Sequence, residues 1–278
     1  MKENPERPLS SSRRQAREMP AQAKLLDQKK LQPQPKAAGG TGDIAIIGLS
    51  GMYPEAENVR EFWSNLRDGK DCITEIPKER WDHSIYFDEE GNKSGKAYSK
   101  WGGFIKGVDQ FDPKFFNISP REAEIIDPQE RLFLKCVYET IEDAGYTREG
   151  LGLERNVGVF VGVMYEEYQL YGAQEQARGK MIAVPGNPAS IANRVSYFCN
   201  FHGPSMAVDT MCSSSLTTIH LACQSLQQDE CELAVAGGVN VSIHPNKYLM
   251  LGQGRFVSSK GRCESSEKAE MGMCRVKA

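Results

Sequence analysis

Short apolar runs alternate along this chain with segments in which large apolar residues recur every three or four positions. The runs predict buried strands at 43–48, 157–163, 205–211 and 233–241. The periodic segments predict amphipathic helices, beginning with one that spans 59–69 and stops at a glycine. Strands that read as continuous apolar runs and alternate with helices indicate a sheet covered on both faces. We therefore expect an α/β protein.

Later helix starts are marked by a capping side chain followed by proline. Segments 119–122 and 127–130 each place Ser or Asp at the N-cap and proline at the first helical position, with a glutamate shortly after, which predicts a capping box. The second of these helices is expected to run to about Ala144 and to end on Gly145. Another is expected to open at Asn187 and Pro188 and to continue to about Asn200.

Cys212 lies where the apolar run 205–211 meets a helical pattern marked by Leu216, Ile219, Cys223 and Leu226. A cysteine at such a strand-to-helix turn lies near unpaired backbone N–H groups and the positive end of the helix dipole. Both favour the thiolate, the form that attacks a carbonyl or thioester. The pattern therefore predicts a nucleophile. The alternative is a small apolar cysteine that fills the core.

Composition narrows the class of protein. The chain has 278 residues, of which 40% are hydrophobic and 26% charged, with a formal net charge of −3 and eight scattered cysteines. This favours a cytoplasmic protein with reduced thiols, without a disulfide framework, a metal site or a bound cofactor. No nucleic-acid partner is indicated, and no apolar run is long enough to span a membrane.

Residues 1–42 differ from the rest because they are rich in Lys, Arg, Gln and Pro and contain few large apolar side chains. Such a segment buries too little apolar surface to offset the entropy lost on ordering. We expect a disordered basic linker at 1–42 and a folded region that spans 43–263.

The segment Asp-Thr-Met-Cys-Ser-Ser-Ser-Leu at 209–216 resembles the active-site signature of the beta-ketoacyl synthases, most closely the ketosynthase domains of modular type I polyketide synthases. Several further segments match the same family in its order along the chain. They are 43–54 (DIAIIGLSGMYP), 111–123 (FDPKFFNISPREA), 127–131 (DPQER), 142–146 (EDAGY) and 236–240 (AGGVN).

The resemblance implies a thiolase-like fold of five alternating layers, αβαβα, built from two similar halves, of which this chain supplies the N-terminal one. It implies that Cys212 accepts an acyl group from the phosphopantetheine of an acyl carrier protein. Decarboxylative Claisen condensation with a malonyl-type extender then follows, supported in the family by two histidines. It further implies homodimerisation through the strand before the nucleophile, and association with other modules of a polyketide synthase.

None of the four histidines, His83, His202, His220 and His244, matches the family's catalytic positions. His220 lies eight residues beyond Cys212, about 12 Å along a helix, which is too far for a direct hydrogen bond. We expect all four to be structural or solvated. The alternatives are a fragment that only dimerises or associates with synthase modules, a thiolase or starter-type synthase, and a cysteine hydrolase that uses Cys212 with His202. Segment 111–131 disfavours the second, and the third lacks a residue to orient its base.

After Cys263 the sequence departs from the Gly-rich segment that the family resemblance implies. Codons started one base early from Ser265 can spell Phe-Gly-Glu-Gly-Gly-Asp-Gly-Tyr-Val-Pro-Gly-Glu-Gly. We therefore expect residues 264–278 to be an out-of-frame tail, with the second half of the domain encoded downstream or lost. The nucleotide sequence after the Cys263 codon tests this expectation.

Overall fold

The structure is a computed structural model that describes residues 42–91, 93–148, 150–151 and 155–262. The chain divides into two compact units, Met1–Asp43 and Ile44–Ala278, and all the described helices and strands belong to the second. Residues 1–41 of the expected linker and the whole of the expected tail lie outside the described residues.

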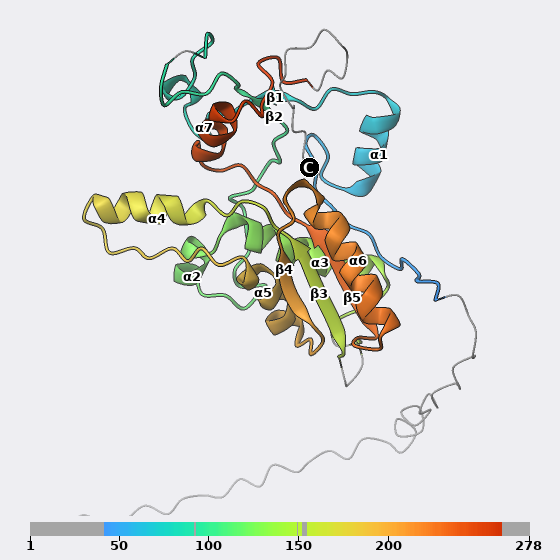
Figure 1. Ribbon diagram of the computed structural model, residues 1–278. Helices are drawn as coiled ribbons and strands as arrows, with labels where there is room; N and C mark the ends of the chain where they lie inside the picture. Colours follow the sequence, from blue (N-terminus) through green and yellow to red (C-terminus); the bar gives the residue numbers. More distant parts are fainter. Residues whose placement is uncertain (1–41, 92, 149, 152–154, 263–278) are drawn as a thin grey trace, which may run out of the picture. The chain divides into compact units, whose positions relative to one another are not determined.

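The described part of the chain contains helices and strands in alternation (Figure 1). The helices are α1 (Val59–Arg67), α2 (Pro120–Ile125), α3 (Pro128–Asp143), α4 (Tyr168–Ala177), α5 (Ala189–Cys199), α6 (Ser214–Gln227) and α7 (Asn246–Gln253). The strands are β1 (Thr74–Glu75), β2 (Trp101–Gly102), β3 (Val157–Gly162), β4 (Ser205–Val208) and β5 (Leu233–Gly238). Two 3₁₀ turns are also present, η2 (His83–Ile85) and η3 (Met211–Ser213).

Three parallel strands form the main sheet, in the order β4-β3-β5. The central strand β3 is buried along its whole length, and Val159 pairs with Ser205 on one side and with Val235 on the other. Because all three strands are parallel, their carboxyl ends meet at one edge of the sheet. The segments that come after the three strands therefore begin side by side.

The two faces of β3 receive different helices. Val157, Val159 and Val161 belong to an apolar cluster with α3 and α5, whereas the next position, Gly162, faces the start of α6. This arrangement arises from the two-residue period of a strand, which sends successive side chains to opposite faces. Figure 1 shows α6 on one face of the sheet and α3 and α5 on the other. The expected α/β class, with a sheet covered on both faces, is confirmed.

The main core lies between β3, α3 and α5. Its most deeply buried members are aliphatic side chains, each no more than 1% exposed. They are Leu134, Val159, Val161, Ile191, Ala192 and Val195. Burial of a Val, Leu or Ile side chain contributes roughly 1.5–3 kcal/mol, so this interface strongly stabilises the sheet.

The predicted helix caps are present, but the capping boxes are not. Ser119 Oγ accepts from the Glu122 N–H at 3.2 Å, and Asp127 Oδ1 accepts from the Gln129 N–H at 2.7 Å. The expectation that the following glutamates bond back to the caps is wrong. Glu122 Oε1 and Glu130 Oε1 each lie 2.7 Å from the guanidinium of Arg194 on α5. An ionic partner on a neighbouring helix replaces the local bond.

Three strand predictions need correction. Residues 43–48 form no strand, and Ile46 is 88% exposed, because no described strand pairs with this apolar run. The other two strands are shorter than expected, since β4 ends at Val208 and β5 ends at Gly238. Both are also only partly buried. They are the edges of the sheet, where one side of the strand has no paired neighbour.

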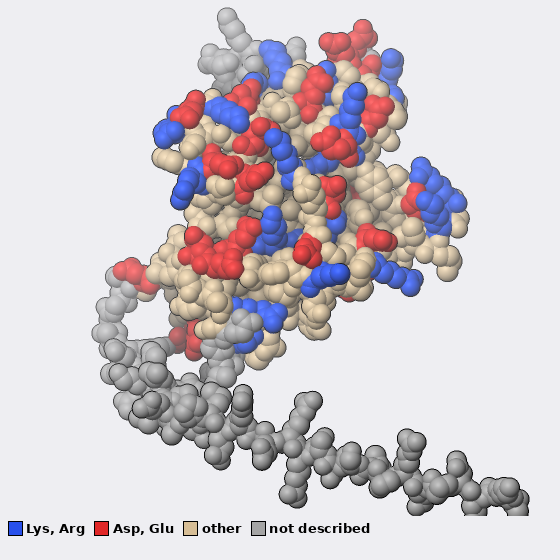
Figure 2. All heavy atoms as spheres, turned by 180° about the vertical axis from the view of Figure 1, so that it is seen from behind, with Lys and Arg blue, Asp and Glu red and all other residues tan. Residues whose placement is uncertain are grey.

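Several elements were not predicted from the sequence. The short strands β1 and β2 pair antiparallel, and beside them lies a small apolar cluster of Ile76, Trp81 and Phe104 against Tyr248 of α7. Within the described residues, no helix is both long enough and apolar enough to cross a bilayer. On the face opposite to that of Figure 1, Lys and Arg side chains are interspersed with Asp and Glu (Figure 2).

Candidate functional site

Cys212 lies in the 3₁₀ turn η3, between the end of β4 and the start of α6. The residue before it, Met211, has a φ of 59°, a left-handed conformation that is uncommon for a residue other than glycine. The Cys212 side chain is exposed. The interpretation of this cysteine as a core filler is therefore wrong, and the expected position at a strand-to-helix turn is confirmed.

Side chains on both sides of Cys212 fix the turn. Asp209 Oδ1 accepts from the Met211 N–H at 2.8 Å. Ser214 Oγ accepts from the Thr210 N–H at 3.0 Å and donates to the Met211 carbonyl at 2.7 Å. Because Ser214 is only 5% exposed, these bonds anchor the turn to the protein interior and leave Cys212 on its outer side.

The first turn of α6 lies directly on the backbone of the sheet. A Cβ added to Gly162 would come within 2.8 Å of the Ser214 carbonyl carbon and of the Ser215 nitrogen, closer than real Cβ atoms approach. One turn further on, Thr218 is fully buried, and its hydroxyl donates to the Gly237 carbonyl at 3.0 Å. These contacts fix the distance between α6 and the sheet, and with it the position of Cys212. Glycine at the end of an apolar strand is the sequence signal that could have predicted this close backbone approach.

Two of the four apolar residues that marked this helix in the sequence do not face the sheet. Leu216 is 72% exposed and Ile219 is 49% exposed. The buried face consists of smaller side chains: Ser214, Thr218, Ala222 and Ser225. The helix was predicted correctly, but which of its faces is buried could not be read from the apolar pattern.

The four histidines take no part in the hydrogen bonds that fix this turn. Within the described residues, no hydrogen bond joins Cys212 to any of them. His202 and His220 are exposed. His244 is buried at 7% exposure, its Nδ1 accepts from the Asn246 N–H at 3.1 Å, and burial lowers its pKa. The pairing of Cys212 with His202 that a hydrolase requires therefore has no support.

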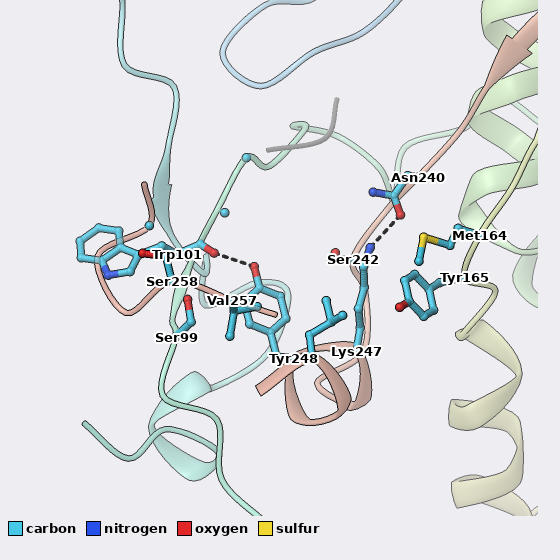
Figure 3. A pocket seen from close by; sticks show the side chains of 14 residues that line it. Ser99, Trp101, Met164, Tyr165, Asn240, Ser242, Lys247, Tyr248, Val257 and Ser258 are labelled. Carbon is cyan, nitrogen blue, oxygen red and sulfur yellow. Dashed lines mark hydrogen bonds between the residues drawn. The ribbon is translucent and has the colours of Figure 1, made fainter. Parts of the chain in front are cut away.

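A cavity of about 70 Å³ opens near the edge of the sheet where the carboxyl ends of the strands meet (Figure 3). Met164, two residues after β3, and Asn240, two residues after β5, form part of its wall. Lys247 of α7 is only 8% exposed and extends into it, with Nζ donating to Asn240 Oδ1 at 2.7 Å. Lys247 and Asn240 were not predicted as site residues, because nothing in the local sequence distinguishes a buried lysine from a solvated one.

A single buried amide joins two of the segments that form this cavity. Gln129, 1% exposed in the first turn of α3, donates through Nε2 to the Tyr165 carbonyl at 2.7 Å. Its Oε1 accepts from the Val241 N–H at 2.9 Å. Both partners are backbone groups just beyond the ends of β3 and β5. Gln129 therefore holds these two segments in a fixed relation.

Carboxyl groups at the start of α3 interact with one in the segment that follows β3. Asp127 is 2% exposed, and burial raises its pKa to about 6, with the charge of Glu130 adding to the effect. Burial and the charges of Asp127 and Glu130 raise the pKa of Glu166 to about 7. One oxygen each of Asp127 and Glu166 is buried without a hydrogen-bond partner. Asp127 and Glu166 therefore hold a proton more readily than ordinary carboxylic acids.

In the described part of the chain, no three His, Cys, Asp or Glu side chains are arranged to hold a metal ion. The six cysteines that the structure describes are all free thiols.

Comparison with known proteins identifies the family. The family described as "Beta-ketoacyl synthase, N-terminal domain" matches residues 41–276. The chain is 73% identical over 231 residues to the polyketide synthase PksL of Bacillus subtilis (strain 168), covering 81% of this chain and 5% of that protein. It is 68% identical over 222 residues to the polyketide synthase ThaG of Burkholderia thailandensis, covering 80% of this chain and 4% of that protein.

Solved ketosynthase structures share the fold. An oxazolomycin ketosynthase domain from Streptomyces albus JA3453 matches with a TM-score of 0.76 and 55% identity, over 78% of this chain and 38% of the other. The ketosynthase from module 6 of the bacillaene synthase of Bacillus subtilis 168 matches with a TM-score of 0.69 and 40% identity, over 79% of this chain and 35% of the other. The chain thus spans less than two fifths of these domains. It belongs to the beta-ketoacyl synthase family, as an N-terminal portion of a ketosynthase domain of the modular polyketide synthases.

Proposed function

We propose that Cys212 is an acyl-accepting nucleophile of polyketide biosynthesis. The observation that carries this proposal is the exposed thiol at the start of α6, in a chain that belongs to the ketosynthase family. N–H groups at the start of a helix can stabilise a developing oxyanion, and we propose the N–H of Cys212 itself for this role. The N–H groups of Ser213 and Ser214 already donate to the carbonyls of Thr210 and Met211 in η3. Met211 and the bonds around it hold the thiol at this helix end.

The proposed step is a transthioesterification. The Cys212 thiolate attacks the thioester carbonyl of an acyl group carried on the phosphopantetheine of an acyl carrier protein. A tetrahedral intermediate forms and collapses, the pantetheine sulfur leaves as a thiol, and the acyl group remains bound to Cys212. The cavity near the carboxyl edge of the sheet is proposed to receive part of that acyl group, because Met164 and Leu251 give it apolar walls.

Condensation with a malonyl-type extender is proposed for the whole synthase to which this portion corresponds. In the family this step uses two histidines, and the described histidines form no hydrogen bond to Cys212. We therefore assign to the residues of this chain the acyl-accepting half of the reaction.

Intact-mass measurement tests the proposal. The full 278-residue chain is incubated with an acyl-pantetheine thioester, and one acyl adduct per chain is expected. The adduct should be absent in Cys212→Ala and should persist in Cys223→Ala, which removes a partly exposed cysteine of α6. An adduct that survives in Cys212→Ala would exclude this residue as the acceptor.

A second candidate function is association without catalysis, which the exposed apolar side chains favour. Tyr197 is 84% exposed, and Met206 on the edge strand β4 is 37% exposed. We propose homodimerisation through β4 and contact with acyl carrier proteins and other synthase modules as the partners of this surface. Sedimentation analysis that gives only monomers at all concentrations would contradict the dimer.

A further inference from the structure

Met211, the residue before Cys212, is held in a backbone conformation that is unfavourable by itself. Its φ of 59° lies in the left-handed region, which residues other than glycine rarely adopt. Such a residue keeps its conformation only where the contacts around it determine that conformation. Here the side chains of Asp209 and Ser214 supply those contacts, the first to the Met211 N–H and the second to the Met211 carbonyl.

Ser214 fixes the peptide group that joins Met211 to Cys212. The carbonyl of this group accepts from two donors of Ser214, its hydroxyl at 2.7 Å and its backbone N–H. The same hydroxyl accepts from the Thr210 N–H at 3.0 Å. Ser214 is only 5% exposed, and a Cβ added to Gly162 of β3 would lie 3.0 Å from its own Cβ. The hydroxyl therefore has little freedom to leave the Met211 carbonyl.

The orientation of this peptide group determines where the Cys212 N–H points. A peptide group is planar and trans, so its N–H points away from its C=O. Because the Met211 carbonyl is turned toward Ser214, the Cys212 N–H is turned the opposite way, out of the start of the helix. Among the residues that the structure describes, no group accepts a hydrogen bond from this N–H. It is thus available to an oxygen of a bound reactant.

We propose that Ser214 is a positioning residue for the reaction at Cys212. It holds the Met211 carbonyl, and through the shared peptide group it directs the Cys212 N–H toward the oxygen on which negative charge develops. Without the hydroxyl, Met211 can relax toward an ordinary backbone conformation, and the Cys212 N–H turns with it. The inference rests on the proposed attack of Cys212 on a carbonyl, and it assigns a role to a residue that acts only through its neighbours.

Two reactions of Cys212 separate this role from a general effect on the turn. With iodoacetamide the thiolate displaces iodide from a carbon atom, and no oxyanion forms. With p-nitrophenyl acetate the thiolate adds to the carbonyl carbon, and the carbonyl oxygen takes up the negative charge. Collapse of this intermediate expels p-nitrophenolate and leaves an acetyl group on the sulfur. Since only acetylation uses an oxyanion donor, the ratio of acetylation rate to alkylation rate reports on the Cys212 N–H.

Peptide mapping of the full chain by mass spectrometry measures both rates at Cys212. We expect Ser214→Ala to lower the ratio of acetylation to alkylation about tenfold, because the donor is misdirected but not removed. Ser225→Ala is the matched control, since Ser225 lies on the same buried face of α6 at 2% exposure, and it should leave the ratio unchanged. Ser214→Thr keeps a hydroxyl and should retain most of the ratio.

The proposal is overturned by an equal ratio in the unsubstituted chain and Ser214→Ala, by an equal loss in Ser225→Ala, or by a lack of acetylation in the unsubstituted chain. If Ser214→Ala does not fold, Asp209→Ala decides, because it removes the bond to the Met211 N–H. A lower ratio in that variant supports the proposal, and an unchanged ratio overturns it. The acetate ester carries no pantetheine, so failure of acyl-pantetheine transfer bears only on the proposed function.

Discussion

Helices α3 and α6 cover opposite faces of the same sheet by different means. Helix α3 buries large aliphatic side chains such as Leu134 and Val137, at 1% and 2% exposure. Helix α6 buries Ser214 and Thr218 and leaves Leu216 exposed. Helix α3 thus packs on the sheet through large apolar side chains. Helix α6 packs on it through close contact between its own backbone and the backbone of β3.

The difference bears on function because α6 begins at the turn that carries Cys212. Large side chains between helix and sheet permit small shifts, whereas a helix in contact with Gly162 and bonded to the Gly237 carbonyl has little room to move. A nucleophile requires that precision more than a core does.

The largest expected effect is a difference in stability between two Leu→Ala variants, one on α3 and one on α6. Leu134→Ala removes a buried side chain of α3, and we expect it to lower the free energy of unfolding by about 2–5 kcal/mol. Leu216→Ala on α6, at a position 72% exposed, should change it by less than about 0.5 kcal/mol. Denaturant unfolding of both variants measures the contrast. A large decrease in the free energy of unfolding for Leu216→Ala would show that another surface covers the outer face of α6 in solution.

The start of α3 should make stability depend on pH. The folded pKa of Asp127 is raised to about 6, above its usual value near 4, so the folded chain binds this proton more tightly. Stability should therefore fall as pH rises from about 4 to 6, by up to about 3 kcal/mol from this group. Asp127→Asn keeps the capping oxygen and should remove that part of the pH dependence.

Thermal unfolding between about pH 4 and pH 8 measures this effect. Asp112→Asn is the control, because Asp112 is an exposed aspartate that also accepts backbone N–H bonds, from Lys114 and Phe115. The same pH profile in wild type and Asp127→Asn would contradict the assignment.

The smallest expected effect concerns the contact between α6 and the sheet. Gly162→Ala places a methyl group against the backbone of Ser214 and Ser215, and we expect a loss of about 1–3 kcal/mol. Gly237→Ala meets only the Phe133 ring at 3.6 Å and should alter stability by less than about 1 kcal/mol. The proposed acylation of Cys212 should slow in Gly162→Ala beyond what its loss of stability explains. Equal behaviour of the two variants would argue that α6 adjusts its position freely.

Helix positions and helix ends were determined well by the sequence. The start of α3 was predicted from Asp127 and Pro128, and its end from Gly145. In the structure Gly145 has a φ of 78°, a left-handed conformation that glycine adopts readily. These features depend on neighbours within one turn, so local sequence contains the information. The strand-to-helix turn at Cys212 was predicted for the same reason.

Only the tertiary structure decided which apolar residues and which polar residues are buried. Ile46 and Leu216 carry the same apolar signal as Val159, yet they are exposed, because burial depends on a partner from elsewhere in the chain. Gln129 and Lys247 are polar, yet they are only 1% and 8% exposed. Gln129 bonds to backbone groups of Tyr165 and Val241, far away in the sequence, and Lys247 bonds to the Asn240 side chain beyond the end of β5. The sequence alone thus determined the family, the local elements and the turn at Cys212. Long-range contacts decided how α6 meets the sheet and what surrounds the cavity, since local sequence does not record the groups that distant segments bring to a side chain.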